Sequence, residues 1–444
     1  MADSKRSIAQ SALKFLSGTL ISRLSGFFRD LSMAYAFGTG AQVAALLVAF
    51  RFAHLFRRLL GEGALQTAFI PLFEDLKGKS EAQAEQFFFD LKGTLACILL
   101  GLIFLASLPL FAAHLYFENE VWLLTLLCLP SLFFICLYGI NTAKLQCERS
   151  FFWPSLSPVI FNLFWILGVF VAKHYPIIIA MRIVACFIVL GCLGQWAMTA
   201  SVYRKFRLPK PFSASTRKIL APLALGVVGV GASQINSALD SVFALIADSK
   251  GPAYLWYAMR IYQLPLALFG LGLSASLLPA LSRSERKKDP LTFKQLLRFG
   301  LILSSASMLL CTFILFFFSE EIVWLLFGRG DFTQSSILGT TACLQLYVVG
   351  LLPTALCSLF ACAFYAKKQF HIPARCTFYG VLLNSALNAL FVFGFSWNAS
   401  SIALATSLSA WFQCFLLGSL LLSANGEGEG IHKSIPENPI QVID

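Results

Sequence analysis

The sequence predicts an all-α polytopic membrane protein with about 12 transmembrane helices, arranged as two six-helix bundles around a central cavity. Of 444 residues, 58% are hydrophobic and only 13% are charged, and the mean hydropathy is +0.75. Soluble domains have a different composition. Long apolar runs recur along the whole chain, each close to the roughly 20 residues that a helix needs to cross the hydrocarbon core. The short alternating segments of a membrane β-barrel do not occur.

Hydropathy places the spanning helices in two groups of six. The N-terminal run carries Arg23 and Arg29 and lacks a small-residue cleavage site, so we expect it to be retained rather than cleaved as a signal peptide. The polar, Gly- and Pro-containing residues 424–444 are expected to form a disordered cytoplasmic tail. The bundles are expected at 1–210 and 211–423, with spans at 10–36, 41–71, 89–115, 120–146, 154–173, 178–203, 218–247, 253–281, 296–318, 335–364, 375–396 and 398–423.

Orientation follows from the 34 lysines and arginines. Twenty-three lie on one side of the predicted spans, and Lys173, Arg182, Lys250 and Arg329 lie on the other. The positive-inside rule then places both termini in the cytoplasm. The net charge of +12 is explained by this topology, so we expect no nucleic-acid partner. The short apolar segment that begins at Glu320 is expected to be an interfacial piece on the outer side.

The remaining basic residues lie within or at the ends of the spans, where an ionised side chain is costly and normally faces a bundle interior or a watery cavity. Intramembrane carboxylates are fewer: Asp30, Glu62 and Asp240. We therefore expect several arginines without an obvious partner and a cationic cavity, which suits a phosphorylated substrate because guanidinium groups bind phosphate bidentately. The alternative is that these side chains snorkel or cap helix ends. The seven residues are Arg23, Arg29, Arg51, Arg57, Arg58, Lys144 and Arg260.

An internal repeat links the two halves at an offset of 209 residues. Arg51 aligns with Arg260, within a window in which Ala49, Leu55, Gly61 and Gly63 match Ala258, Leu264, Gly270 and Gly272. The repeat predicts two units in the same orientation with the substrate site between them. It also predicts that RRLLGEG is helical and that Glu62, one turn after Arg58, can pair with it. Arg51 and Arg260 are expected about 10 Å below the outer surface, at about seven residues into their helices.

Several stretches resemble the MurJ (MviN) family of lipid II flippases, within the multidrug, oligosaccharide-lipid and polysaccharide exporter superfamily. They are SRLSGFFRD from Ser22, FGTG from Phe37, VAFRFAHLFRRLLGEGALQTAFIPLF from Val48, SFFWPSLSPVIFNL from Ser150, YAMRIYQLP from Tyr257 and FYAKKQFHIP from Phe364. The resemblance implies an alternating-access transporter, not an enzyme. It would move undecaprenyl-pyrophosphate-linked disaccharide peptide outward across the bacterial inner membrane, with membrane lipids and cell-wall synthesis proteins as partners. The family's essential cavity arginines fall on Arg23, Arg29, Arg57 and Arg260.

The resemblance also has departures and further implications. Family members often carry acidic residues where this chain has Ala44, Met259 and Gln369. Two further C-terminal helices that commonly hold the lipid tail are not expected here. No cofactor is implied, and without a nucleotide motif the energy is expected from an ion gradient or the membrane potential. Some relatives bind sodium, and the matching oxygen ligands, which could equally make ordinary interhelical hydrogen bonds, are Asp240, Asn384, Asn388 and Thr406.

Alternatives from other classes make different demands on the sequence. A flippase for another polyprenyl-pyrophosphate oligosaccharide would need the same cationic cavity, whereas a drug/cation antiporter would need a negative one. A membrane transferase would need a catalytic base and an acidic metal-binding cluster, but the five histidines are dispersed and no DxD or Walker motif is present. A scaffold without transport activity would tolerate loss of the arginines. The twelve cysteines are scattered singly without a CxxC pair, which disfavours disulfides and zinc.

Overall fold

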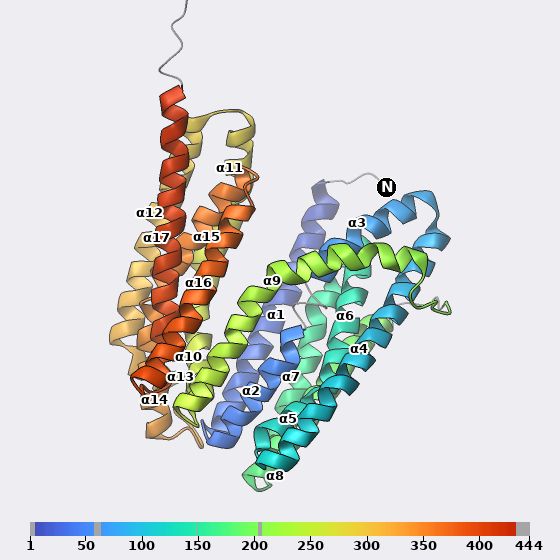
Figure 1. The fold of residues 1–444 in the computed structure, drawn as a ribbon, viewed down its shortest axis with the longest axis vertical. Helices are drawn as coiled ribbons and strands as arrows, with labels where there is room; N and C mark the ends of the chain where they lie inside the picture. The colour runs from blue at the N-terminus through green and yellow to red at the C-terminus, as the bar shows by residue number, and fades with distance from the viewer. Residues whose placement is uncertain (1–4, 57–63, 149, 203–206, 432–444) are drawn as a thin grey trace, which may run out of the picture. The chain divides into compact units, whose positions relative to one another are not determined.

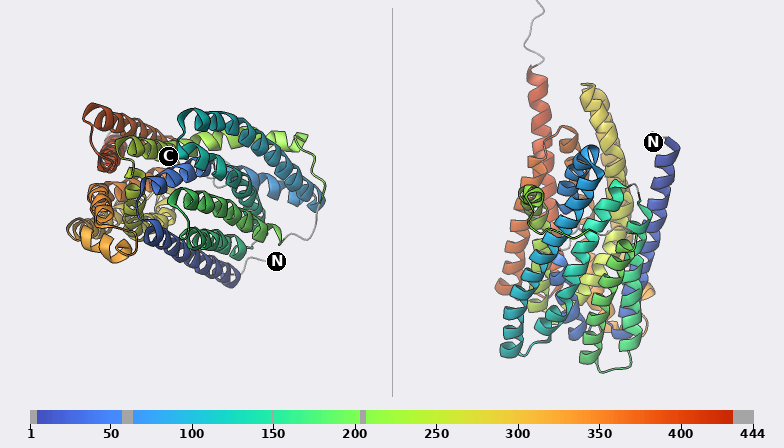
Figure 2. Two further views of the ribbon diagram at one scale, coloured as in Figure 1. Left: turned by 90° about the horizontal axis from the view of Figure 1, so that it is seen from below. Right: turned by 90° about the vertical axis from the view of Figure 1, so that its right-hand side faces the viewer.

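The computed structural model describes residues 5–56, 64–148, 150–202 and 207–431, shown in Figures 1 and 2. Helices account for the regular structure throughout these ranges, and no strand occurs in them. The chain divides into two compact units. The first contains Met1–Tyr257, Glu320–Cys343 and Ala389–Ile402, and the second contains Ala258–Ser319, Leu344–Asn388 and Ala403–Asp444. The predicted bundle boundary near residue 210 stays a prediction.

The helices follow the predicted spans closely. The first eight are α1 (Lys5–Phe37), α2 (Ala41–Phe56), α3 (Ala64–Lys79), α4 (Glu81–Phe117), α5 (Glu120–Cys128), α6 (Pro130–Cys147), α7 (Phe152–Ala172) and α8 (Ile177–Ala200). Next come α9 (Ala214–Ala247), α10 (Gly251–Pro265), the π-helix η2 (Leu266–Leu271), α11 (Gly272–Arg286), α12 (Pro290–Phe317) and α13 (Ser319–Phe327). The last are α14 (Gln334–Val348), α15 (Leu351–Ala366), α16 (His371–Ala389), η3 (Leu390–Gly394) and α17 (Ser400–Ile431).

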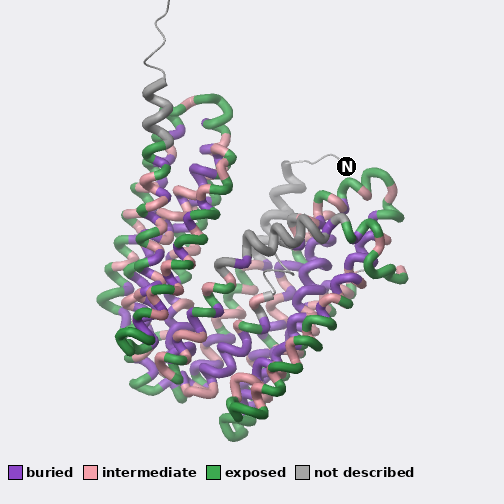
Figure 3. Tube along the Cα trace, viewed as in Figure 1, coloured by how far each residue is buried: buried purple, intermediate pink, exposed green. Residues whose placement is uncertain are grey.

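Length and composition confirm a multi-pass membrane protein. Among the described residues, eight helices are long and apolar enough to cross a bilayer, and the bent pair α14 and α15 would make a ninth. Shorter apolar stretches, Ala41–Ala53 and Gln234–Ala247, add to these. Within the described residues, the predicted spans fall on helices or on consecutive helices, so the predicted fold class is confirmed. The most apolar window of α4 is only 11% buried, and Figure 3 shows exposed residues along this helix, as expected for a surface facing acyl chains.

Several predicted boundaries differ from the structure, and three of the differences are instructive. The helix predicted to begin at residue 89 begins at Glu81, eight residues earlier. The span predicted at 120–146 breaks before Pro130, which occupies the first turn of α6, where a missing N–H costs nothing. At the C-terminus α17 continues to Ile431, past the predicted end at 423, while residues 432–444 lie outside the described part of the chain. The prediction that RRLLGEG is helical also falls outside it.

The turn between α1 and α2 is fixed by glycine. Gly38 has φ +58°, a left-handed conformation that favours glycine, and a Cβ there would collide with the carbonyl oxygen of Asp331. Gly330, at φ +65°, packs in the same way against the carbonyl oxygen of Tyr35, which accepts a 2.9 Å hydrogen bond from the Asp331 amide. The predicted outer interfacial piece is therefore the helix α13 followed by a turn that rests on the end of α1.

The linker between α8 and α9 is attached to α4. The amide of Lys210 donates to Asp90 Oδ1 at 2.8 Å, and the amide of Phe212 donates to Thr94 Oγ1 at 2.9 Å. Gln86 Nε2 bonds both Asp90 Oδ1, at 2.7 Å, and the carbonyl of Leu208, at 3.0 Å. Asp90 is 5% exposed, so the buried carboxylate is satisfied mainly by this linker and its own helix.

In the second unit, α12 begins with a side-chain cap. Asp289 accepts a 3.0 Å hydrogen bond from the amide of Thr292, and Pro290 follows at the first helical position. This hydrogen bonding by Thr292 holds the pKa of the exposed Asp289 carboxyl below its ordinary value. The core of the unit forms where α11, α12 and α15 meet, around Leu281, Phe293, Leu359 and Phe364.

Candidate functional site

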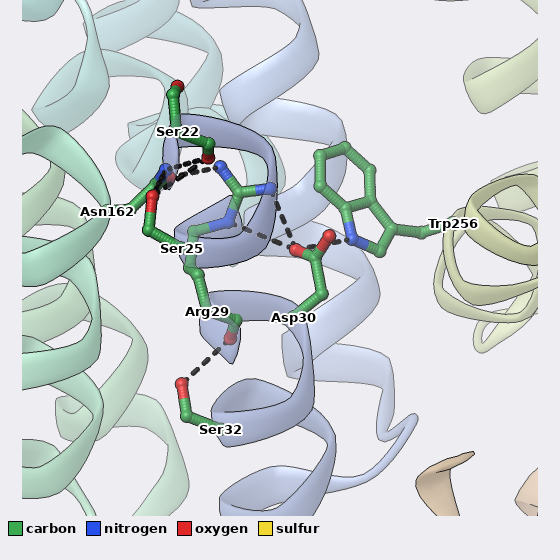
Figure 4. Close-up of polar contacts among 7 residues, drawn as sticks. All are labelled: Ser22, Ser25, Arg29, Asp30, Ser32, Asn162 and Trp256. Carbon is green, nitrogen blue, oxygen red and sulfur yellow. Dashed lines mark hydrogen bonds and ion pairs between the residues drawn. The ribbon is translucent and has the colours of Figure 1, made fainter. Parts of the chain in front are cut away.

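A buried ion pair lies at the centre of the first unit, on α1. Arg29 Nε and Nη2 donate to Asp30 Oδ1 at 3.0 and 2.8 Å, and Arg29 Nη1 donates to Asn162 Oδ1 on α7 at 3.1 Å (Figure 4). The side chains of Arg29 and Asp30 are only 10% and 4% exposed. Three of the five guanidinium N–H groups are therefore used by described residues. The predicted intramembrane charges Arg29 and Asp30 do come together.

Aromatic rings surround this pair. The Arg29 Cζ lies 4.9 Å from the ring centre of Trp165 and 6.0 Å from that of Trp256, on α10. Trp256 Nε1 donates to Asp30 Oδ1 at 3.3 Å, so the indole contacts both partners of the pair. Phe50 of α2 packs edge-on against Trp165 and Trp256, with ring centres 4.8 and 5.9 Å apart. Because the rings exclude water, they strengthen electrostatic interactions at the site.

Polar groups of α1 and α7 form hydrogen bonds with each other beside the Arg29–Asp30 pair. Asn162 Nδ2 donates to Ser25 Oγ at 2.8 Å and to the carbonyl of Ser22 at 3.4 Å, while its oxygen accepts from Arg29. Gly18 on α1 packs so closely on Ser155 of α7 that a Cβ there would collide with the serine side chain. Small residues let two membrane helices approach, and the amide and hydroxyl groups then bond across the contact. The SRLSG motif thus positions Arg29 against α7.

The second cation of the site is Arg51 on α2. Its Nη1 donates to Ser241 Oγ at 2.6 Å and to the carbonyl of Ser237 at 3.4 Å, both on α9. Its Cζ lies 5.5 Å from the ring centre of Trp256. Both guanidinium groups therefore lie within cation–π distance of the Trp256 ring. Two cations and the carboxylate of Asp30 contact Trp256, so this cluster is net positive.

The other predicted site residues are distributed differently. Arg23 is exposed on α1, six residues before Arg29 and on another face of the helix. Arg260 is half-buried at the start of the second unit. Arg57, Arg58 and Glu62, including the predicted Arg58–Glu62 pair, lie outside the described residues.

Lys144 is not part of this cluster. Its Nζ forms ion pairs with Glu85 at 2.9 Å and Glu148 at 3.6 Å, and it lies 4.6 Å from the ring centre of Phe88. Lys144 and Arg29, two of the seven predicted intramembrane basic residues, therefore each have a carboxylate partner. Glu85 was missed because the predicted helix began at residue 89, which left this carboxylate outside the membrane region.

The predicted sodium ligands fall in both units. In the second unit Asn388 Nδ2 donates to Asn384 Oδ1 at 3.0 Å, and Asn384 Nδ2 donates to Thr406 Oγ1 at 3.3 Å. In the first unit Asp240 is buried and accepts a 3.4 Å hydrogen bond from Asn236. Asn384, Asn388 and Thr406 thus come together as an interhelical hydrogen-bond network, as the alternative interpretation expected. Across the residues described, no three His, Cys, Asp or Glu side chains form a metal-binding group, and the sodium site stays a prediction.

Sequence reasoning missed four residues of the cluster: Asn162, Trp165, Ser241 and Trp256. The signal for Asn162 was present, because an amide inside an apolar helix needs a hydrogen-bond partner. Trp256 lies four residues before Arg260 and immediately before the quoted motif YAMRIYQLP, but nothing in the sequence indicates that its ring contacts two arginines from other helices.

Comparison with known proteins identifies the family. The model of the family described as lipid II flippase MurJ matches residues 33–433. A relative from Chlamydia pneumoniae, described as a probable lipid II flippase MurJ, is 33% identical over 422 residues, which cover 94% of this chain and 77% of that protein. A relative from Aquifex aeolicus with the same description is 31% identical over 419 residues, covering 91% of this chain and 81% of that protein.

Solved structures agree with the sequence comparison. A lipid II flippase MurJ in an inward closed conformation matches with a TM-score of 0.81 and 26% identity, over 93% of this chain and 87% of that one. An inward-facing multidrug resistance MATE family transporter matches with a TM-score of 0.74 at 15% identity, over 94% and 99% of the two chains, which shows the fold alone. The predicted resemblance is confirmed, and this membrane protein is a transporter rather than an enzyme. The chain belongs to the lipid II flippase MurJ family.

Proposed function

We propose that this protein moves lipid II, the lipid-linked peptidoglycan precursor, from the cytoplasmic to the periplasmic leaflet of the bacterial inner membrane, with both termini in the cytoplasm. The observation that carries the proposal is the cluster of Arg29, Asp30 and Arg51 around Trp256, in a chain that belongs to this family. A pyrophosphate is the charged part of such a substrate, and arginine forks bind its oxygens bidentately.

The geometry suggests how the pyrophosphate would be bound. Arg29 has two N–H groups beyond the three that bond Asp30 and Asn162, and Arg51 binds the neutral oxygens of Ser237 and Ser241. A phosphate oxygen can take the place of these serine oxygens as an acceptor for Arg51. The Arg29–Asp30 pair would meanwhile limit the positive charge of the empty site. Arg23, Arg57, Arg58 and Arg260 are proposed to extend the cationic surface of the cavity, with Glu62 as a local partner.

Alternating access is the proposed cycle. A site that opens to one side at a time allows the charged head group to cross without exposing the arginines to hydrocarbon. The membrane potential is proposed as the energy source, at about 2.3 kcal/mol per charge per 100 mV. Sodium binding by Asp240, Asn384, Asn388 and Thr406 remains a further proposal. It predicts that sodium, but not potassium, protects the purified protein against heat.

The test is complementation in cells depleted of their own lipid II flippase. Alanine at Arg29, Arg51 or Arg260 should abolish growth while the amount of protein in the membrane stays normal. Arg29→Lys should rescue poorly, because an ammonium keeps the charge but loses the planar fork. The matched control is Arg217→Ala, an exposed arginine at the start of α9, which should grow like the wild type. Wild-type growth from all the cluster variants would contradict the proposal.

A second readout follows the substrate itself. In the complementing cells, labelled lipid II should become accessible to a membrane-impermeant enzyme only on the outer surface of wild-type and Arg217→Ala cells. The variants that fail to grow should accumulate lipid II that this enzyme cannot reach. Accumulation of a different polyprenyl-pyrophosphate oligosaccharide instead would favour the alternative substrate.

A further inference from the structure

A cavity of about 370 Å³ lies between α1, α7 and α13 in the first unit, away from the arginine cluster's ligands. Phe28, Leu31 and Tyr35 line it from α1, where spacings of three and seven residues place them on one face of the helix. Phe170 lines it from α7 and Phe327 from α13. The groove runs for roughly 10 Å along α1, the rise of seven helical residues.

The groove opens on the lipid-facing surface. Phe28 is 60% exposed and Phe170 is 52% exposed, although both rings border the cavity. α7 is long and apolar enough to cross a bilayer, and hydropathy predicts a span at 10–36 in α1, so we expect the medium at these positions to be hydrocarbon rather than water. An elongated apolar hollow with unpacked aromatic rings on its sides fits an acyl chain, which gains dispersion contacts that a flat helix surface cannot offer.

Two cations lie at one end of the groove. Arg329 lines the cavity, and its Nη1 donates to the carbonyl of Leu325 at 3.0 Å, which holds the exposed side chain at the end of α13. Lys173 follows α7, and its Nζ lies 4.8 Å from the ring centre of Tyr35, a residue that lines the same cavity. The nearby Asp331 is exposed and its amide bonds Tyr35, so the rim carries two positive charges and one negative charge.

Lys173 and Arg329 lie on the side of the predicted spans that carries few basic residues. Lys173 and Arg329 are two of the four basic residues on the side opposite the 23 that set the topology. Selection for topology therefore does not account for them. Arg329 keeps guanidinium N–H groups beyond the one that bonds Leu325, and these can bind phosphate oxygens.

We propose that this groove binds an anionic glycerophospholipid such as phosphatidylglycerol, with one acyl chain along Phe28, Leu31 and Phe170 and the phosphate at Arg329 and Lys173. The lipid belongs to the leaflet opposite the basic loops. This site is independent of the proposed transport function, because none of the cluster residues Arg29, Asp30 and Arg51 lines it. A free phosphate has no acyl chain that could bind in the apolar groove. A zwitterionic lipid is attracted less strongly by the net positive charge at the end of the groove.

The first experiment is native mass spectrometry of the detergent-purified full chain with added dioleoyl phosphatidylglycerol or dioleoyl phosphatidylethanolamine. The wild type should prefer phosphatidylglycerol, and Arg329→Gln should reduce that preference about fivefold, the usual effect of one cation at an anionic lipid surface. Lys173→Gln should act in the same direction. The matched control, Lys250→Gln, removes an exposed basic residue of the same side that does not line the groove. Equal binding of the two lipids by the wild type, or no change in Arg329→Gln, would overturn the proposal.

The second experiment locates the acyl chain in the unmodified protein. Phosphatidylglycerol with a photoreactive group in its acyl chain should label the peptides that contain Phe28 and Phe170, and unlabelled phosphatidylglycerol should compete. Ser32→Leu, which adds volume inside the groove, should reduce this labelling while leaving other labelled peptides unchanged. Equal labelling of the exposed faces of α4 and α12 would show that no specific groove site exists, even if the charge variants altered lipid preference.

Discussion

At the scale of single residues, the Arg29–Asp30 pair decides the electrostatics of the cluster. Both side chains are almost completely buried, and the Trp256 and Asn162 side chains satisfy further hydrogen bonds of the pair. Taking two charges out of water costs several kcal/mol per ion, which the pair recovers only through good geometry and added hydrogen bonds. Removing one charge of the pair should therefore lower the stability of the fold more than removing both charges.

Loss of the Asp30 charge should destabilise the fold. Asp30→Asn keeps the shape but leaves the buried Arg29 cation without its carboxylate, so we expect a loss of about 3 kcal/mol, at the lower end for broken buried pairs. The double variant Arg29→Gln/Asp30→Asn should recover part of that loss. Thermal unfolding of the purified protein in detergent, followed by tryptophan fluorescence, would measure both. A double variant less stable than either single variant would show that the pair is a net source of stability.

At the scale of elements, the linker after α8 is fixed to the N-terminal half of α4. Asp90 accepts hydrogen bonds from the Lys210 amide and from Gln86, and Thr94 accepts from the Phe212 amide. The Cβ that an alanine would add at Gly93 would collide with Pro209, so the linker lies directly on the helix. Because this linker leads into α9, it limits how far α9 can move relative to α4.

Loss of the Asp90 carboxylate should release the linker. In Asp90→Ala, the amide of Lys210 should exchange hydrogen at least tenfold faster than in the wild type, because its acceptor is lost. The amide of Phe212, whose acceptor is Thr94 Oγ1, should also exchange faster because the linker is held less firmly. Stability should fall by about 1 to 3 kcal/mol, the usual cost of leaving buried donors unsatisfied. Asp75→Ala, an exposed carboxylate on α3, is the control. Unchanged exchange at both amides would mean that proline packing alone holds the linker.

Most elements could be predicted because apolar length is a local property of the sequence. In the described part of the chain the predicted spans coincide with helices, and the short apolar segment from Glu320 lies in the helix α13. The breaks within spans, such as the one before Pro130, were missed because both sides of the break are equally apolar. Of the site, only the charged residues were predicted from the sequence. Asn162 lies 133 residues from Arg29, and Trp256 lies 226 residues from Asp30, so their contacts depend on tertiary packing that no local pattern records.

At the scale of the whole molecule, the helix boundaries agree with the internal repeat. Adding the offset of 209 to the first residue of α4, residue 81, gives 290, the first residue of α12. The same offset takes the start of α2 at residue 41 to within one residue of the start of α10 at 251. Arg51 and Arg260 therefore occupy equivalent positions in equivalent helices, as the alignment predicted.

Both arginines lie well inside their helices. Arg51 follows the start of α2 by ten residues and Arg260 follows the start of α10 by nine, which at 1.5 Å per residue is about 15 and 13.5 Å. The predicted depth of about 10 Å below the outer surface stays a prediction, and these distances give the position of each arginine along its helix. A residue this far inside a helix is reached from the outer aqueous phase only through an opened cavity, which makes it a reporter of alternating access.

The last prediction uses these positions as reporters in a variant whose twelve native cysteines have been replaced. Cysteine at 51 or 260 should react with a membrane-impermeant thiol reagent added outside when the protein is held outward-open, and should be protected when it is held inward-facing. Cysteine at 57, which the repeat places six residues further along the same helix, should be shielded from the outside in the inward-facing state. Position 217, exposed on α9 and expected on the cytoplasmic side, is the control and should never react from outside in intact cells. Because positions 51 and 260 are equivalent in the repeat, they should also change together, with one cavity opening exposing both. Labelling at 51, 57 and 260 that is equal in every trapped state would exclude a cycle in which the two equivalent helices line a cavity open to one side at a time.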